Sequence, residues 1–260
     1  MKKIIHLSDL HVGYRHCQSH LNTVVNRIIF LKEPAQDYLI IITGDFVNDA
    51  TQTGLYQAAL VEINRLKTAG FQILICPGNH DYGTGSNGHK ELVPTFKAAF
   101  LGSPSVTFPK LDIIGTTAFI GLDTMADELN WYDHLFAEGE LGQNQLSALQ
   151  QLLTTSEVNA CHHRVVYLHH HPFDQRPFHG LKDKEKLEKI LTGKIDCLLY
   201  GHNHDGHAAN GKWSIPRCYD AGSTTRKNFD NPAKHSPIRI IDLTRSPSLD
   251  YDLGNPGIPI

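Results

Sequence analysis

The chain alternates between short apolar runs and longer segments in which apolar residues recur at helical spacing. Apolar runs at residues 3–7, 38–43 and 71–76 predict three strands, because each is short and rich in isoleucine. Residues 20–31 and 55–68 carry apolar side chains along one side of a helix, and Gly70 predicts the end of the second helix. This β-α-β-α-β order predicts a mostly parallel sheet covered by helices.

The rest of the chain predicts more strands than helices. We expect strands at residues 106–108, 113–114, 117–122, 164–168, 195–200, 218–221 and 238–241, and helices at 141–153 and 182–191. The close spacing of the strands between residues 106 and 122 predicts a more antiparallel region. Asn210-Gly211 predicts a hairpin turn between strands at 207–209 and 212–215. The chain shows no linker and no internal repeat, so we expect a single domain over residues 1–260, with 243–260 as an irregular, Pro-, Gly- and Ser-rich strap.

Five of the predicted strands are followed directly by side chains that can bind metal. These are Asp9 and His11; Asp45, Asn48 and Asp49; Asn79, His80 and Asp81; His169, His170 and His171; and His202 and His204. In open α/β sheets, ligands bind outside the carboxyl ends of the strands. We therefore expect these five strand ends to converge on one place.

Imidazole together with carboxylate suits Mn, Fe or Zn, and the absence of cysteine from the set argues against a structural zinc finger. The set holds more ligands than one ion needs. Two metal ions about 3.5–4 Å apart form a clamp for in-line displacement at phosphorus. Asp45 follows Gly44 in a tight turn and is the candidate for a bridging ligand. Asp9 and His11 lie on one side of an extended segment and can share an ion, whereas His202 and His204 have the same spacing but could bind different ions.

Each of these signals is weak when it stands alone. A histidine after a strand is more often a hydrogen-bonded residue than a ligand, and a Gly-Asp pair is more often only a turn. Three consecutive residues, His169, His170 and His171, cannot all bind one ion. The metal hypothesis depends on the five signals occurring together at successive strand ends.

Composition narrows the class of protein. The chain has 260 residues, 17 histidines, a formal net charge of −3 and no long basic run, which argues against a nucleic-acid partner. Its five cysteines form no C-x-x-C pair, which favours a reducing compartment, and no apolar segment has the length of a membrane span. We therefore expect a cytoplasmic protein, and the sequence predicts no oligomeric state.

The order of the five motifs resembles the calcineurin-like metallophosphoesterase superfamily. Those motifs are D-x-H at residues 9–11, G-D-x-x-N at 44–48, G-N-H-D at 78–81, H-H-x-P at 169–172 and G-H-x-H at 201–204. Residues 121–153 also look like the middle region of a bacterial branch that includes cyclic-nucleotide and glycerophosphodiester phosphodiesterases. The resemblance implies an α/β fold of two packed mixed sheets flanked by helices, a four-layer α/β/β/α sandwich.

The resemblance also implies a role for each site residue. The first ion would bind Asp9, His11, Asp45 and His204, and the second would bind Asp45, Asn79, His169 and His202. The family uses the first histidine of the fourth motif, His169, but the additional His171 leaves His170 open as an alternative. His80 would face the substrate phosphoryl group and assist the leaving oxygen, Asn79 would help stabilise charge, and Asp81 would orient His80.

The activity that the resemblance implies is hydrolysis of a small phosphodiester. A hydroxide bound by two Mn, Fe or Zn ions would attack phosphorus directly, without a phosphoenzyme. A phosphomonoesterase or protein phosphatase would use the same site, and a non-catalytic scaffold on the same fold is a further alternative. A DNA nuclease would need a basic track.

Two loops are expected to shape the substrate pocket, at residues 81–94 and 125–140. The first is glycine-rich and longer than the segment expected in cyclic-nucleotide enzymes, which counts against cyclic AMP as substrate. Trp131, Tyr132 and Phe136 in the second could stack on a base or cover an apolar leaving group, or could only pack the loop onto the body.

Overall fold

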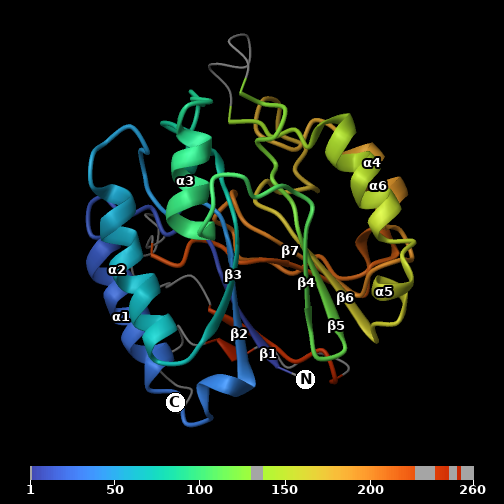
Figure 1. Ribbon diagram of the computed structural model, residues 1–260, viewed down its shortest axis with the longest axis horizontal. Helices are drawn as coiled ribbons and strands as arrows, with labels where there is room; N and C mark the ends of the chain where they lie inside the picture. Colours follow the sequence, from blue (N-terminus) through green and yellow to red (C-terminus); the bar gives the residue numbers. More distant parts are fainter. Residues whose placement is uncertain (1, 130–136, 226–237, 246–250, 253–260) are drawn as a thin grey trace.

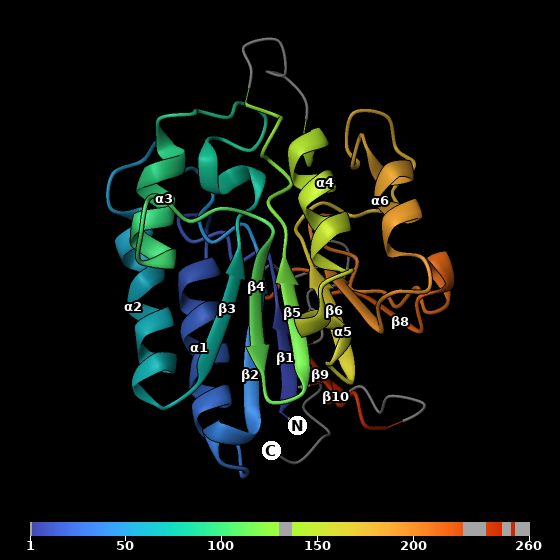
Figure 2. The ribbon, with the colours of Figure 1, turned by 45° about the vertical axis from the view of Figure 1, so that its right-hand side comes forward.

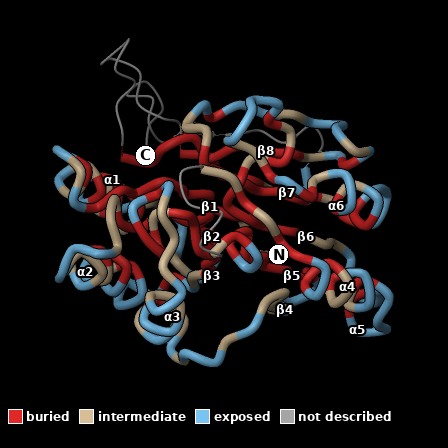
Figure 3. The backbone as a smooth tube through the Cα atoms, turned by 90° about the horizontal axis from the view of Figure 1, so that it is seen from above, coloured by how far each residue is buried: buried red, intermediate tan, exposed pale blue. Residues whose placement is uncertain are grey.

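Two five-stranded sheets pack face to face between two layers of helices (Figure 1). This computed structural model describes residues 2–129, 137–225, 238–245 and 251–252. The predicted four-layer α/β sandwich is confirmed. Figure 3 shows buried chain running through the middle of the molecule and exposed chain along the outer sides of the helices.

The first sheet is formed mostly by the N-terminal third of the chain. Its strands in order are β10 (Tyr251–Asp252), β9 (Arg239–Ile241), β1 (Lys3–Leu7), β2 (Tyr38–Thr43) and β3 (Gln72–Cys76). It is covered by α1 (Cys17–Ile29), α2 (Leu55–Thr68) and α3 (Leu92–Leu101), and the short 3₁₀ turns η1 (Ala35–Asp37) and η2 (Asn79–Tyr82) stand in its connections (Figure 1).

The second sheet follows in the chain and is covered on its outer face. Its strands in order are β4 (Lys110–Ile114), β5 (Thr117–Gly121), β6 (His163–Tyr167), β7 (Cys197–Tyr200) and β8 (Arg217–Asp220). The helices on this side are α4 (Gly142–Leu152), α5 (Ser156–Asn159) and α6 (Lys184–Leu191), and η3 (Lys212–Ser214) precedes β8 (Figure 2).

The apolar runs are continuous because the strands are buried on both faces. In β2, Ile40 and Ile42 pack with the helices, while Leu39 and Ile41 join the apolar layer between the two sheets. Strands β1, β2 and β3 are parallel and in register, as are β5, β6, β7 and β8. The carboxyl ends of each parallel set therefore lie at one edge of its sheet.

The expectation of a more antiparallel region between residues 106 and 122 is confirmed by the β4–β5 pair, and the rest of that sheet is parallel. Only β4 runs antiparallel to its neighbour, whereas β5 to β8 are parallel because helices connect β5 to β6 and β6 to β7. Residues 106–108 form no strand, since the next residue, Pro109, has no N–H group for a ladder. Helix α3 was not predicted, because its segment was assigned partly to a glycine-rich loop.

The predicted hairpin at Asn210-Gly211 is also wrong. Residues 212–214 form η3, and the antiparallel partner of residues 207–209 is β8, through an Ala208–Tyr219 bridge. The Asn210 side chain accepts a hydrogen bond from the Cys218 backbone N–H at 3.0 Å, and the Gly211 N–H donates to the Ile215 carbonyl oxygen at 2.9 Å. These two bonds close a wider loop than a two-residue turn.

In the C-terminal segment that was expected to be irregular, Tyr251–Asp252 forms β10 and pairs with β9. All five cysteines are buried free thiols. Within the part of the chain that the structure describes, no helix is both long and apolar enough to cross a membrane.

The layer between the sheets should carry much of the stability. Ile41 is fully buried there, so Ile41→Ala should lower the free energy of unfolding by about 2–5 kcal/mol. Val61→Ala on α2 is the control, because the Val61 side chain is 58% exposed, and it should change the free energy by less than about 0.5 kcal/mol. Urea unfolding of both variants measures this. Equal midpoint shifts would contradict the assignment of the core.

Candidate metal centre

The loops after β1, β2, β3, β6 and β7 meet at one edge of the sandwich. The Asp9 N–H donates to the Gly44 carbonyl oxygen at 3.0 Å, which joins the loops after β1 and β2. The Gly201 N–H donates to the His169 carbonyl oxygen at 2.9 Å, which joins the loops after β6 and β7. The His169 imidazole then reaches across to the Thr43 carbonyl oxygen of the first sheet at 2.7 Å.

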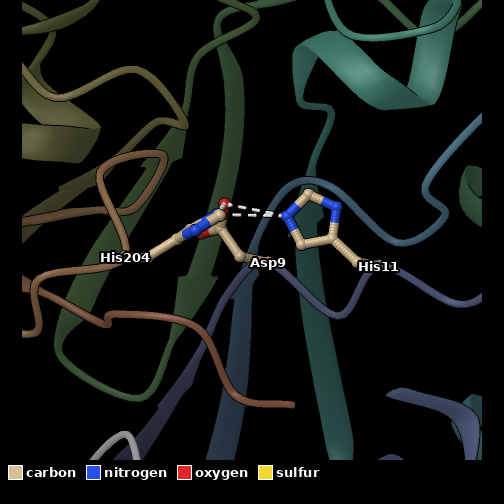
Figure 4. A group of neighbouring side chains, drawn as sticks. All are labelled: Asp9, His11 and His204. Carbon is tan, nitrogen blue, oxygen red and sulfur yellow. Dashed lines mark hydrogen bonds and ion pairs between the residues drawn. The ribbon is translucent and has the colours of Figure 1, made fainter. Parts of the chain in front are cut away.

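One cluster at this edge consists of Asp9, His11 and His204 (Figure 4). The Nε2 atoms of His11 and His204 are 3.1 Å apart. Asp9 Oδ1 lies 3.0 Å from His204 Nε2 and 3.7 Å from His11 Nε2. Figure 4 shows the three side chains turned toward one another from loops that are far apart in the sequence.

A second cluster is centred on His169. Its Nε2 atom lies 2.9 Å from Asn79 Oδ1, 3.2 Å from His202 Nδ1 and 3.4 Å from Asp45 Oδ2. All four side chains are buried. Asp45 belongs to both clusters, because the same Oδ2 atom is also 3.8 Å from His11 Nε2.

The two buried carboxylates are held in the same manner. Asp45 Oδ1 accepts a hydrogen bond from the His80 backbone N–H at 2.9 Å, which leaves Oδ2 facing the imidazoles. Asp9 Oδ2 accepts from the His202 backbone N–H at 3.0 Å, which leaves Oδ1 facing His11 and His204. Each carboxylate thus has one oxygen fixed by backbone and one available to a ligand.

The hydrogen bonds around the second cluster assign its protons. His169 Nδ1–H donates to the Thr43 carbonyl oxygen, and His202 Nε2–H donates to the His179 carbonyl oxygen at 3.0 Å. When both rings are neutral, the remaining ring nitrogens therefore point lone pairs at each other. The Asn79 amide NH₂ donates to the Gly85 carbonyl oxygen at 2.8 Å, so its oxygen also faces inward. Lone pairs that converge without an N–H or O–H group between them suit a cation. This set of nitrogen and oxygen ligands fits a transition metal.

The pKa values of the site residues also indicate that positive charge stabilises the site. Burial lowers the pKa of His169, but the charge and hydrogen bond of Asp45 outweigh it and raise that pKa to about 10. Burial raises the pKa of Asp9 and of Asp45, but the histidines around them hold both well below the usual range. Burial lowers the pKa of His11 to about 4. A proton on His169 therefore takes the place of the positive charge that a metal ion would bring.

The backbone at the site is strained. Five site residues other than glycine have a positive φ: Asp9 at 55°, His11 at 42°, Asp45 at 55°, His202 at 74° and His204 at 60°. This conformation is costly for residues with a side chain and is concentrated at functional sites. It turns each strand sharply at its end. A glycine is needed at position 78, because a Cβ on Gly78 would lie 2.3 Å from Asp45 Oδ1.

Asp81 does not orient His80, contrary to expectation. The Asp81 carboxylate accepts hydrogen bonds from the backbone N–H groups of Asp45, Phe46 and Gly78 at 2.7–2.8 Å, so it ties the loops after β2 and β3 together. His80 Nδ1–H donates instead to the Asn48 carbonyl oxygen at 2.6 Å. The imidazole is thereby held with Nε2 toward Gly85, where an added Cβ would lie 2.5 Å from that nitrogen.

The structure brings His169 to the cluster and leaves His170 behind it. His170 Nδ1 is bonded to Thr124 Oγ1 at 2.7 Å, and its ring packs 4.4 Å from the His202 ring. His171 packs against Tyr200 at 4.6 Å. Asp49 is also outside the cluster, because it accepts a hydrogen bond from the Thr51 N–H in its own loop at 2.9 Å. Trp131, Tyr132 and Phe136 lie outside the described residues.

The segment after β8 supports the first cluster, a role that the sequence did not predict. Ser223 Oγ donates to the Asp9 carbonyl oxygen at 2.8 Å, and Thr225 Oγ1 donates to the Leu10 carbonyl oxygen at 2.7 Å. The Thr224 N–H donates to the Ser8 carbonyl oxygen at 2.9 Å. A parallel assignment for β8 would have identified this segment as another strand end at the same edge.

Comparisons with known proteins agree on the fold. A family model described as calcineurin-like phosphoesterase matches residues 2–206. A purple acid phosphatase from seeds of yellow lupin (Lupinus luteus) is 13% identical with a TM-score of 0.51, over 80% of this chain and 38% of that one. A putative 5′-nucleotidase from Staphylococcus aureus is 15% identical with a TM-score of 0.51, over 86% and 49%. The chain thus spans less than half of either protein. A search of curated proteins found no match.

Metal binding at the second cluster should release a proton. Without metal, His169 is protonated below a pKa of about 10, and a cation at Nε2 must expel that proton. The affinity for Zn²⁺ or Mn²⁺ should therefore rise about tenfold per pH unit between pH 7 and 9. Calorimetric titration in two buffers of different ionisation enthalpy counts the protons. His207→Ala, at an exposed histidine, should leave the count unchanged, whereas His169→Gln should remove about one. Binding to the wild-type chain without proton release would contradict this assignment.

Proposed function

The chain belongs to the calcineurin-like phosphoesterase family, and from that premise we propose that it is a metal-dependent phosphodiesterase acting on a small phosphodiester. One observation carries the proposal. Ring nitrogens of two imidazole pairs, His11 with His204 and His169 with His202, face each other at 3.1 and 3.2 Å on either side of Asp45. Two adjacent cation sites that share a carboxylate suit the transfer of a phosphoryl group.

In this proposal two ions of Mn, Fe or Zn are held by residues from both sheets. The ligands of the first are Asp9, His11, Asp45 and His204, and those of the second are Asp45, Asn79, His169 and His202. Bound metal ions would supply positive charge to the phosphoryl oxygens and acidify a water molecule. The carbonyl oxygens of Thr43, His179 and Gly85 accept hydrogen bonds from the side chains of the ligands His169, His202 and Asn79. These bonds keep the metal-binding atoms of the ligands aimed inward, so binding both ions and substrate costs less free energy.

His80 is proposed as the group that assists the leaving oxygen. Its ring is 4.9 Å from the His11 ring, and its Nδ1–H is committed to the Asn48 carbonyl oxygen. Nε2 is the atom left to carry or accept a proton at the site. A half-buried imidazole held in this way is suited to protonating an alkoxide as it departs. Asn79, whose amide orientation is fixed by Gly85, would stay beside the phosphoryl group.

Support for a diester over a monoester comes from the loops around the centre. A diester has two organic arms, and one of them must be accommodated beside the phosphorus. Residues from both expected pocket loops, 81–94 and 125–140, line a common cavity with apolar walls, which gives such an arm a place. A phosphomonoesterase on the same residues is the alternative that the following assay separates.

Metal-stripped protein should regain hydrolysis of bis(p-nitrophenyl) phosphate when Mn, Fe or Zn is added back. Asp45→Ala should lose at least about a hundredfold in rate, because even outer-shell partners of metal ligands contribute 10–100-fold. His80→Ala should lose about 10²–10⁴-fold while keeping its metal content, as expected for a proton donor. Release of p-nitrophenolate measures the rates, and elemental analysis measures the bound metal.

The control for this assay is His207→Ala, an exposed histidine three residues after the G-H-x-H motif, which should keep both rate and metal. A strong preference for p-nitrophenyl phosphate would replace the diesterase with a monoesterase. Folded protein that binds two metal ions but cleaves neither substrate, and also no alkyl diester, would contradict the proposed chemistry.

A further inference from the structure

A cavity of about 480 Å³ lies between α3 and the loop that follows β5. We name it the α3 pocket and define it by Lys90, Val93, Lys97, Phe108, Met125 and Leu129. Its size falls in the range of sites for small molecules. It is separate from the metal ligands, and nothing in the clusters described above uses these side chains.

The α3 pocket lies toward the same edge of the sandwich as the metal centre. Met125 and Leu129 follow the carboxyl end of β5, and Phe108 comes just before β4, whose first residue, Lys110, pairs with Gly121 at that end. The two sites are joined through η2, which contains His80 and Tyr82. The Tyr82 hydroxyl donates to Asp123 Oδ2 at the base of the pocket at 3.1 Å. The pocket is therefore linked by a direct hydrogen bond to the element that carries His80.

One wall of the α3 pocket combines apolar and cationic side chains. Val93 and Lys97 are four residues apart and share one face of α3, and Lys90 lies in the turn just before the helix. Lys97 Nζ lies 5.7 Å from the centre of the Phe108 ring, in the range of a cation–π contact. A lysine held against an aromatic ring at the rim of an apolar cavity suits an anion attached to an apolar body.

One acidic residue, Asp123, also lines the pocket; burial raises its pKa, and the charge of Lys97 acts against that rise. Asp123 is buried, and its two oxygens accept hydrogen bonds from the Tyr82 hydroxyl and from the Met125 backbone N–H at 2.9 Å. Its carboxylate is thus committed to the protein at the base of the pocket. Among the lining residues, two lysines, Lys90 and Lys97, stand against one carboxylate, Asp123.

We propose that the α3 pocket binds the leaving-group arm of the substrate, and that this arm is apolar and carries a negative charge. This inference rests on the proposed phosphodiesterase function and adds the class of substrate to it. The position beside η2 favours the arm whose oxygen His80 would protonate. The apolar walls hold the body of the arm, and Lys97 at the rim selects its anionic group.

Binding to the α3 pocket can be measured without turnover. Fluorescence of 8-anilinonaphthalene-1-sulfonate, an apolar anion, should report binding to metal-free protein, and decanoate should displace it at least about tenfold better than decyltrimethylammonium. Lys97→Glu should weaken binding of the probe about tenfold or more, and Ala126→Trp, at an exposed position of the lining, should also weaken it by filling the space. Lys194→Glu, an exposed lysine elsewhere, is the matched control and should have no effect. Equal displacement by the two decyl compounds would overturn the charge selection.

Turnover then tests the link to catalysis. Methyl 4-carboxyphenyl phosphate and methyl 4-(trimethylammonio)phenyl phosphate differ in the charge of the leaving arm. The wild-type chain should prefer the carboxylate by about tenfold in kcat/KM, with bis(p-nitrophenyl) phosphate as the reference diester. Lys97→Glu should remove or reverse that preference, whereas the matched control Lys194→Glu should keep it. An unchanged preference in Lys97→Glu would contradict the proposed role of the α3 pocket. If none of the three diesters is hydrolysed, the proposed function is wrong. The fluorescence titration tests binding to the α3 pocket independently of that outcome.

Discussion

The burial of two carboxylates, those of Asp9 and Asp45, is the constraint on which the site depends. Both side chains are excluded from solvent, and a buried charge is costly unless it is paired. Each carboxylate satisfies one oxygen with a backbone N–H from another loop. The other oxygen has only imidazole nitrogens around it. In that setting the protein must either bind a proton, as the raised pKa of His169 indicates, or bind a cation.

The need to pair these two buried charges explains the conformation of the loops. The strands end at one edge because their parallel registers are aligned, and the chain then reverses through left-handed residues at the ligand positions themselves. The strain is tolerated because the loops are tied to one another. Asp81 accepts three backbone N–H groups from two loops, and the hydroxyl-bearing segment after β8 supports Asp9. The packed layer between the sheets gives these loops a rigid base.

The sequence allowed the fold class and the site to be predicted because both depend on local patterns. The apolar runs of β1 and β2 and the helical spacing of α2 match the structure, and the ligand-bearing residues follow strands that do end together. The parts that failed depend on contacts distant in the sequence. Whether Asp81 faces His80 or the backbone of another loop cannot be read from the motif, and the choice between His169 and His170 depends on how β6 is placed against Thr43.

The proposed site depends on two adjacent metal ions that share Asp45. Diffraction from metal-loaded crystals at wavelengths on either side of the absorption edge of the metal tests it directly. We expect two anomalous peaks about 3.5–4 Å apart. One peak should lie within bonding distance of Asp9, His11 and His204, the other within bonding distance of Asn79, His169 and His202, with Asp45 between them. A single peak, or two peaks that do not share Asp45, would contradict it.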